Sequence, residues 1–142
     1  MEYFCFEINN MRNYSNIFTW IARLVAAVIL LQTLYFKFSG AEESIYIFSR
    51  LGAEPWGRIG SGVVELIASI LILFPRTSGY GALIGLGVMS GAILSHLAIL
   101  GIEIQNDGGL LFFYACIVFI SCFYLVWINR KQLPVLNKLF LK

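Results

Sequence analysis

The sequence predicts an all-α integral membrane protein: a four-helix bundle with a short amphipathic interfacial helix between the first two spans. Hydrophobic residues make up 59% of the 142 residues, charged residues make up 13%, and the mean hydropathy is +0.81. Soluble domains carry roughly 25% charged residues. Four apolar runs are also long enough to cross a bilayer, which takes about 20 residues. We therefore expect a single membrane domain over residues 1–142.

The composition also narrows the classes of function. A formal net charge of +2 is too small to indicate a nucleic-acid-binding protein. The three cysteines form no CxxC pair, and Cys116 and Cys122 fall on different faces of one expected helix, so no thiol redox pair is indicated. No haem, flavin or iron–sulfur motif is visible, and one histidine with scattered carboxylates lacks the ligand spacing of a metal site.

The first span is expected over residues 17–38. Five of its residues recur at spacings of four, three, four and three, and so form one stripe that we expect to face the bundle: Arg23, Ala27, Leu30, Leu34 and Lys37. Charges inside a membrane usually face a partner or a wet cavity. The alternative is that each long cationic side chain reaches the nearest headgroup layer.

The segment 40–52 differs from the four spans because its polar and apolar residues alternate with helical spacing. Ser39 followed by Glu42 fits a capping box at a helix start. Ile45, Phe48 and Leu51 form an apolar stripe. We expect a short helix on the membrane surface that covers the bundle like a lid.

The second span, expected over residues 57–74, carries a carboxylate, Glu65, at its centre. An ionisable group at the middle of a bilayer costs about 2.5–3.5 kcal/mol on insertion scales. Glu65 therefore needs a partner inside the bundle. Arg58 lies on the same helix face.

The third span, residues 78–100, follows a turn so short that it must lie antiparallel to the second. It contains two glycine pairs with the spacing of closely packed membrane helices, Gly81 with Gly85 and Gly87 with Gly91. His96 lies near its far end, either as a helix-end hydrogen-bonding group or as a functional residue.

The last span is expected over residues 110–128, after an Asp107-Gly108-Gly109 turn. Tyr114 lies on its one mildly polar stripe, and residues 129–142 are expected to form a basic cytoplasmic tail. The side of the membrane that holds both termini and the second loop carries more basic residues than the opposite side. They are Arg12, Arg76, Arg130, Lys131, Lys138 and Lys142, against Lys37, Arg50 and Arg58. The positive-inside rule then predicts that both termini are cytoplasmic.

Depth along the spans suggests which charges meet. Counted from the inner ends of their spans, Arg23 and Glu65 differ in height by roughly 4–5 Å at 1.5 Å per residue. An arginine side chain can bridge that height, so we predict a buried Arg23–Glu65 pair. We expect an outer polar cluster of Lys37, Arg58, His96 and Asp107 beneath the amphipathic helix.

This order of features resembles the DoxX family of small four-helix membrane proteins. The matching stretches are ARLVAAVILLQTLYFKFSG, EPWGRIGSGVVELIASILILFPRT, GAILSHL and NDGGLLF, which together reach from about residue 17 to about residue 131. The resemblance implies a multi-pass protein of the bacterial inner membrane. It also implies an association with thiosulfate:quinone oxidoreductase or related membrane redox complexes, and so a subunit that interacts with quinone or with a protein partner.

Three functions remain open. As a quinone-facing or accessory redox subunit, the chain would contact quinone through Glu65, His96 and Tyr114, and Lys37 could add a donor. As a carrier, the buried charges would line a route for protons or a small anion. As a structural or assembly subunit, the buried pair would only fix helix register and the glycine-rich faces would dock another protein or another copy. Whether the chain is itself catalytic stays open.

Overall fold

The computed structural model describes the backbone of residues 2–133 and, within it, the side chains of residues 16–130, 132 and 133. Every regular element in this part of the chain is a helix. The elements are α1 (Glu2–Ser39), α2 (Glu42–Arg50), α3 (Trp56–Leu73), α4 (Ser78–Ser95), the π-helix η1 (His96–Leu100), α5 (Leu110–Ile128) and the 3-10 helix η2 (Arg130–Gln132).

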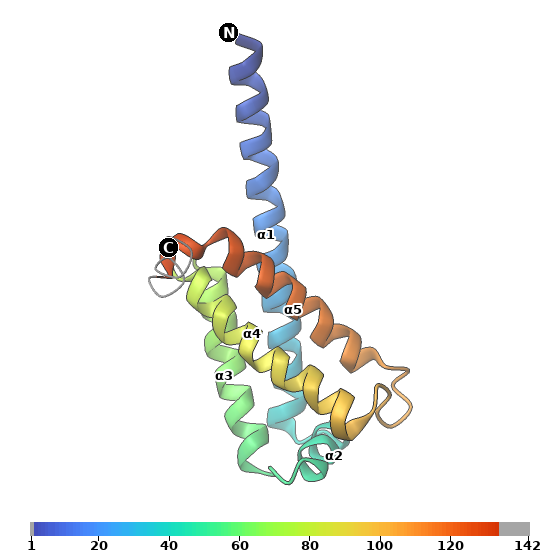
Figure 1. Cartoon of the computed structure of the whole chain (residues 1–142). Coiled ribbons are helices and arrows are strands. Elements are labelled where there is room, and N and C mark those ends of the chain that lie inside the picture. The colour runs from blue at the N-terminus through green and yellow to red at the C-terminus, as the bar shows by residue number, and fades with distance from the viewer. Residues whose placement is uncertain (1, 134–142) are drawn as a thin grey trace, which may run out of the picture.

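The four long helices form a bundle in which α1 and α4 lie diagonally opposite each other, each packed between α3 and α5. The short helix α2 closes one end of the bundle, and the amino-terminal half of α1 projects beyond the other end (Figure 1). Four segments have the length and hydropathy of membrane spans: Asn16–Ser39, Trp56–Leu73, Ser78–Leu100 and Leu110–Ile128. The predicted all-α membrane bundle with a short helix between its first two spans is therefore confirmed.

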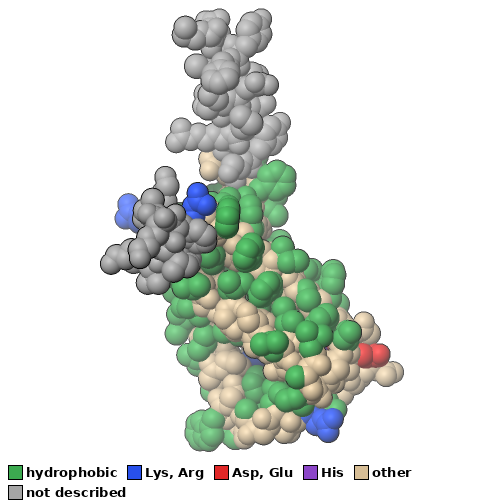
Figure 2. Space-filling view, in the orientation of Figure 1, with side chains coloured by type: hydrophobic (Ala, Val, Ile, Leu, Met, Phe, Trp, Pro, Cys, Tyr) green, Lys and Arg blue, Asp and Glu red, His purple; other side chains and the backbone are tan. Residues whose placement is uncertain are grey.

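The outer surface of the bundle is apolar. Figure 2 shows hydrophobic side chains spread over the visible faces of α4 and α5, with basic side chains towards the two ends. The exposed residues include large aliphatic and aromatic side chains from the middle of the helices, such as Ile67, Leu83 and Phe123. A surface of this kind suits contact with lipid acyl chains, where a helix can be hydrophobic all round.

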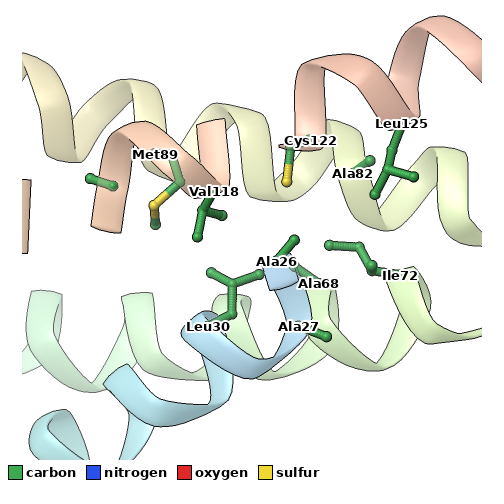
Figure 3. Packing of buried hydrophobic residues seen from close by; sticks show 11 residues of the cluster. Ala26, Ala27, Leu30, Ala68, Ile72, Ala82, Met89, Val118, Cys122 and Leu125 are labelled. Atoms are coloured by element: carbon green, nitrogen blue, oxygen red, sulfur yellow. The ribbon is translucent and has the colours of Figure 1, made fainter. Parts of the chain in front are cut away.

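The tightly packed part of the core lies in the half of the bundle away from α2. Ala26 and Leu30 of α1 meet Ile72 of α3, Val118 and Leu125 of α5 there, each at most 1% exposed (Figure 3). Small residues let the backbones approach closely. A Cβ added at Gly81 of α4 would lie 2.6 Å from the backbone nitrogen of Ile72, so α3 and α4 touch at this point.

Several element boundaries differ from those predicted. Helix α1 begins at Glu2 and so extends beyond the predicted span 17–38, and the predicted span 78–100 consists of α4 followed by the π-helix η1. The predicted capping box is wrong: α1 continues through Ser39, whose hydroxyl donates to the Phe36 carbonyl oxygen at 3.5 Å. The N-cap of α2 is instead Ala41, which has no side-chain oxygen.

The segment after α5 is packed against the bundle, not free as a tail. Asn129 and Leu133 are buried, and Gln132 makes two hydrogen bonds to the α3–α4 turn region. Its Oε1 accepts from the Gly79 amide at 3.1 Å, and its Nε2 donates to the Pro75 carbonyl oxygen at 2.9 Å. Residues 129–133 of the predicted tail are therefore packed against the bundle. The rest of it, 134–142, lies outside the described residues.

Candidate functional site: a cavity beneath helix α2

A cavity of about 430 Å³ occupies the half of the bundle next to α2. Its floor is formed by Leu30, Met89 and Val118, which also belong to the packed core. All four long helices contribute to its walls, and α2 covers it. Most of the lining is apolar. The polar residues of the lining are Thr33, Lys37, Glu43, Ser44, Ser61, Glu65, Ser95, His96, Asp107 and Tyr114.

The carboxylate of Glu65 is buried in the wall of this cavity, at 1% exposure. Its Oε1 accepts a hydrogen bond from Lys37 Nζ in a salt bridge, and its Oε2 accepts from Thr33 Oγ1 at 2.9 Å. Thr33 and Lys37 lie one turn apart on α1, so both reach the same carboxylate on α3. A buried charge with a hydrogen-bonded partner of opposite sign avoids much of the cost of burial.

The predicted Arg23–Glu65 pair is wrong. Arg23 is buried at the opposite end of the bundle, where its Nε donates to Ser78 Oγ at 3.1 Å and its guanidinium lies 5.2 Å from the Trp20 ring centroid. Thr33, which contacts Glu65, is ten residues further along α1, about 15 Å away at 1.5 Å per residue. The height prediction failed because Arg23 lies level with the start of α4, at the edge of the bundle and not six residues inside it.

The predicted inward stripe of α1 is nevertheless confirmed. Arg23, Ala27, Leu30 and Leu34 are buried, and Lys37 is half-buried against the cavity. Both cationic side chains thus face the interior of the bundle, and they lie at opposite ends of it.

His96 lies at the junction of α4 and η1, with its side chain 5% exposed. Its Nδ1 lies 2.8 Å from the Gly101 carbonyl oxygen. A carbonyl oxygen can only accept, so Nδ1 must carry the hydrogen and Nε2 of the neutral ring has a free lone pair. Nε2 has no hydrogen-bond partner among the described residues, and the imidazole lines the cavity. It is therefore available to a ligand.

Asp107 lines the cavity and also caps the start of α5. Its Oδ1 accepts from the Ile104 and Gly109 amides at 2.8 and 2.9 Å, and its Oδ2 accepts from the Leu111 amide at 3.0 Å. Burial acts to raise the pKa of Asp107, but the hydrogen bonds from the three amides outweigh burial and hold the pKa below its ordinary value. Asp107 is therefore a structural carboxylate, ionised at neutral pH.

Arg58 belongs to the frame of the site and not to its lining. Its guanidinium donates to the Lys37 carbonyl oxygen, and its Nη2 lies 2.7 Å from Oε1 of Glu54, in the segment between α2 and α3. Arg58, on α3, thus joins the end of α1 to the connection between α2 and α3. Three residues of the predicted outer cluster line the cavity: Lys37, His96 and Asp107. Arg58 lies outside the lining.

Helix α2 covers the cavity with a face that differs in part from the predicted one. Phe48 and Leu51 line the cavity as the stripe predicts, but Ile45 is 39% exposed, and Ser44 and Ile47 take its place. The Lys37 ammonium lies 6.0 Å from the Phe48 ring centroid, within the range of a cation–π contact.

Lys37, His96 and Tyr114 are among the lining residues that have hydrogen-bonding capacity left. Lys37 Nζ uses one of its N–H groups on Glu65. The Tyr114 hydroxyl and His96 Nε2 have no hydrogen-bond partner among the described side chains. All three of these residues were identified from the sequence. Thr33, the second hydrogen-bond donor to Glu65, was missed, although Thr33 lies one helical turn before Lys37 and so on the same face of the helix. In the described part of the chain no cluster of three or more His, Cys, Asp or Glu could hold a metal.

Comparison with known proteins gives one clear match. The family model DoxX matches residues 18–98, more than half of the chain, and this stretch includes α2, α3, α4 and the second half of α1. Searches of curated proteins and of solved structures found no match. The matched stretch contains Thr33, Lys37, Glu65 and His96 of the cavity wall. With four membrane spans and this match, the chain is a multi-pass membrane protein that belongs to the DoxX family.

Proposed function

We propose that the cavity binds the headgroup of a membrane quinone, and that the protein is a quinone-interacting or accessory subunit of a membrane redox complex. The observation that carries this proposal is an apolar cavity of about 430 Å³ with a few polar groups converging on it inside a membrane bundle. Small-molecule sites have this composition and volumes of roughly 300–1,000 Å³. A planar ring with two carbonyl oxygens suits such a lining.

The residues of the cavity fit a quinone ring in three respects. Lys37 can donate a second N–H to a carbonyl oxygen, and the Tyr114 hydroxyl can donate to another. His96 Nε2 can accept a proton, with Nδ1 held by the Gly101 carbonyl oxygen. A bound quinone would supply two-electron, two-proton chemistry. Glu65 would hold the Lys37 ammonium at the wall of the cavity.

This proposal requires a protein partner. No electron-carrying cofactor motif is visible in the sequence, so electrons would pass to or from another subunit or a second copy of the chain. The DoxX resemblance favours a complex of thiosulfate or sulfur oxidation in the bacterial inner membrane. The positive-inside pattern favours cytoplasmic termini, with α2 on the outer side.

Two tyrosines of α5 provide the test. Tyr114 lines the cavity, whereas Tyr124 packs against the closed core. Removing one neutral hydrogen bond costs about 0.5–1.5 kcal/mol, so Tyr114→Phe should weaken the binding of a benzoquinone to the protein in nanodiscs by about 2–10-fold. Tyr124→Phe should leave the affinity unchanged. A wild-type protein that neither co-purifies with quinone nor binds it would exclude the proposal.

A structural role is the second candidate, because the Lys37–Glu65 salt bridge joins α1 to α3 and could serve only to fix helix register. The double variant Lys37→Met/Glu65→Gln separates the two roles. If the doubly substituted protein binds quinone and its partner as tightly as wild type, the pair is structural. Loss of quinone binding with an intact fold favours the quinone site.

A further inference from the structure

Helices α3 and α4 are in contact at one end and diverge towards the cavity. At Gly81 an added Cβ would meet the Ile72 nitrogen at 2.6 Å and the Ala68 carbonyl oxygen at 2.8 Å. At Gly91, nearly three turns further along α4, an added Cβ would meet nothing within 4 Å. Figure 1 shows the two helices separating towards the end that α2 covers, and there Ser61 of α3 and Gly91 of α4 both line the cavity, with a gap between the helices.

Gly91 marks the place where the cavity opens to the outside. It lines the cavity and is also exposed on the surface of the bundle. A residue with a long side chain can line the cavity with one end and contact the exterior with the other. A glycine has only backbone atoms. The cavity and the exterior must meet at or beside its Cα.

Ser61 of α3 lies at the same height. It is eleven residues from Ile72, and Gly91 is ten residues from Gly81, so each lies about 15 Å from the contact point of the two antiparallel helices. Ser61 also lines the cavity. Its hydroxyl donates to the Arg58 carbonyl oxygen of its own helix at 3.1 Å. The hydroxyl hydrogen of Ser61 is therefore used within its own helix.

The gap lies within the depth of the acyl chains. Gly91 is in the interior of the candidate span Ser78–Leu100, and the exposed side chains one turn away are apolar, Val64 on α3 and Leu94 on α4. We infer that Gly91 and Ser61 form a lateral portal through which the hydrocarbon tail of a bound ligand leaves the cavity for the lipid. The ligand class is then a polar ring with a long tail, bound ring-first towards His96 and Lys37.

This inference rests on the proposed quinone site and adds the route to it. At equilibrium a tailed ligand keeps the portal occupied, whereas a tail-less ring only passes through it. A side chain that fills the portal should therefore lower the affinity for the tailed ligand and leave the affinity for the bare ring unchanged.

The experiment compares Gly91→Leu with Gly87→Leu. Gly87 lies one turn earlier on α4, is exposed and has nothing within 4 Å of an added Cβ, but it does not line the cavity. Protein in nanodiscs is equilibrated with an isoprenoid-tailed benzoquinone or with its tail-less parent, and the quinone recovered with the protein is quantified by absorbance. Gly91→Leu should lower the affinity for the tailed quinone at least tenfold and that for the tail-less ring less than twofold. Gly87→Leu should change neither.

Two results would overturn the portal while leaving the quinone site standing. One is unchanged binding of the tailed quinone by Gly91→Leu. The other is an equal loss of both ligands, which would mean that the leucine fills the cavity itself. If Gly91→Leu does not fold by circular dichroism, Ser61→Leu tests the same opening from α3. If wild-type protein binds neither ligand, the proposed function fails, and the portal with it.

Discussion

Glu65 shows how far a single residue can be understood from the sequence. A carboxylate in the middle of an apolar run predicts a buried cation, and the stripe of α1 narrowed the choice to Arg23 and Lys37. The choice between them depended on where the bundle begins, which the length of the apolar run does not fix. In the structure Lys37 forms the salt bridge with Glu65, and Arg23 donates a hydrogen bond to Ser78.

The Lys37–Glu65 pair yields a prediction for stability. Lys37→Met leaves a charge buried without its cation and should lower the free energy of unfolding by about 3–5 kcal/mol. The double variant Lys37→Met/Glu65→Gln should regain most of that loss, because it buries no charge. Unfolding in mixed detergent micelles, followed by circular dichroism, measures both. In the same assay the losses of unfolding free energy caused by Arg23→Gln and by Glu65→Gln should add in the double variant, because the two residues are not in contact. A departure from additivity of more than about 1 kcal/mol would contradict the observed pairing.

Asp107 yields a prediction for pH dependence. Its folded-state pKa lies below the ordinary 3.8, so its ionised form stabilises the fold above about that pH, and this stabilisation is lost as the pH falls through the lower folded pKa. Asp107→Ala also removes a cap and should cost about 1–2 kcal/mol at neutral pH. Thermal unfolding from pH 7 to pH 3 should show the difference between wild type and variant shrinking below pH 4. A difference that grows in acid would be inconsistent with this.

At the level of elements, the two glycine pairs of α4 have the same spacing and different surroundings. Gly81 and Gly85 pack against α3 and against Cys122 of α5, as predicted. Gly87 and Gly91 meet nothing within 4 Å, so this pair does not pack against another helix of the bundle. Because α4 is apolar on nearly every side, hydropathy does not reveal which face meets a neighbour. Spacing alone therefore could not separate the two pairs.

This difference gives a paired prediction. Gly81→Ala places a methyl group against backbone atoms that cannot move aside, and should lower the free energy of unfolding by about 1–3 kcal/mol. Gly87→Ala adds a methyl group in open space and should be neutral or slightly stabilising, since alanine is the better helix former. Thermal unfolding of the two variants in one detergent compares them directly. Equal effects would show that α3 and α4 do not touch at Gly81.

Helix α2 was predictable as an element, but its contacts were not. The amphipathic pattern and the glycine and proline after it predicted a short helix, and one is present over Glu42–Arg50. The cavity face includes Ser44 and Ile47 because the helix is rotated relative to the predicted stripe. In a helix of nine residues a rotation of one position changes the inward set, and the sequence does not determine that rotation.

At the level of the whole molecule, one half of the bundle is packed and the other half is hollow. The sequence predicts four spans of similar length and hydropathy and gives no sign of this asymmetry. The hollow half depends on the divergence of α3 and α4, on the π-turn after Ser95 and on a lid formed by α2. Each of these is a property of how helices meet. The polar residues of the cavity were visible in the sequence; the space between them was not.

The orientation of the whole molecule in the membrane stays a prediction, and it can be compared with where the basic residues without a salt bridge lie. On the α2 side, Lys37 and Arg58 are neutralised by Glu65 and Glu54, which leaves Arg50 as the unpaired basic residue among the described ones. Arg76 and Arg130 lie at the opposite end with no salt bridge in the described part of the chain. The basic residues without a salt bridge are thus more numerous at that end, which agrees with the predicted cytoplasmic termini.

Cysteine labelling of intact cells tests this orientation in a variant whose three native cysteines are replaced by serine or alanine. Ser49 lies on the exposed face of α2. Phe74 lies at the far end of α3 with 61% of its surface exposed, and replacing it with cysteine removes no basic residue. A membrane-impermeant maleimide should label Ser49→Cys in intact cells, and Phe74→Cys only after permeabilisation. The reverse pattern would place α2 in the cytoplasm. The cavity would then face the inner surface, and any proton taken up through His96 would come from the cytoplasm.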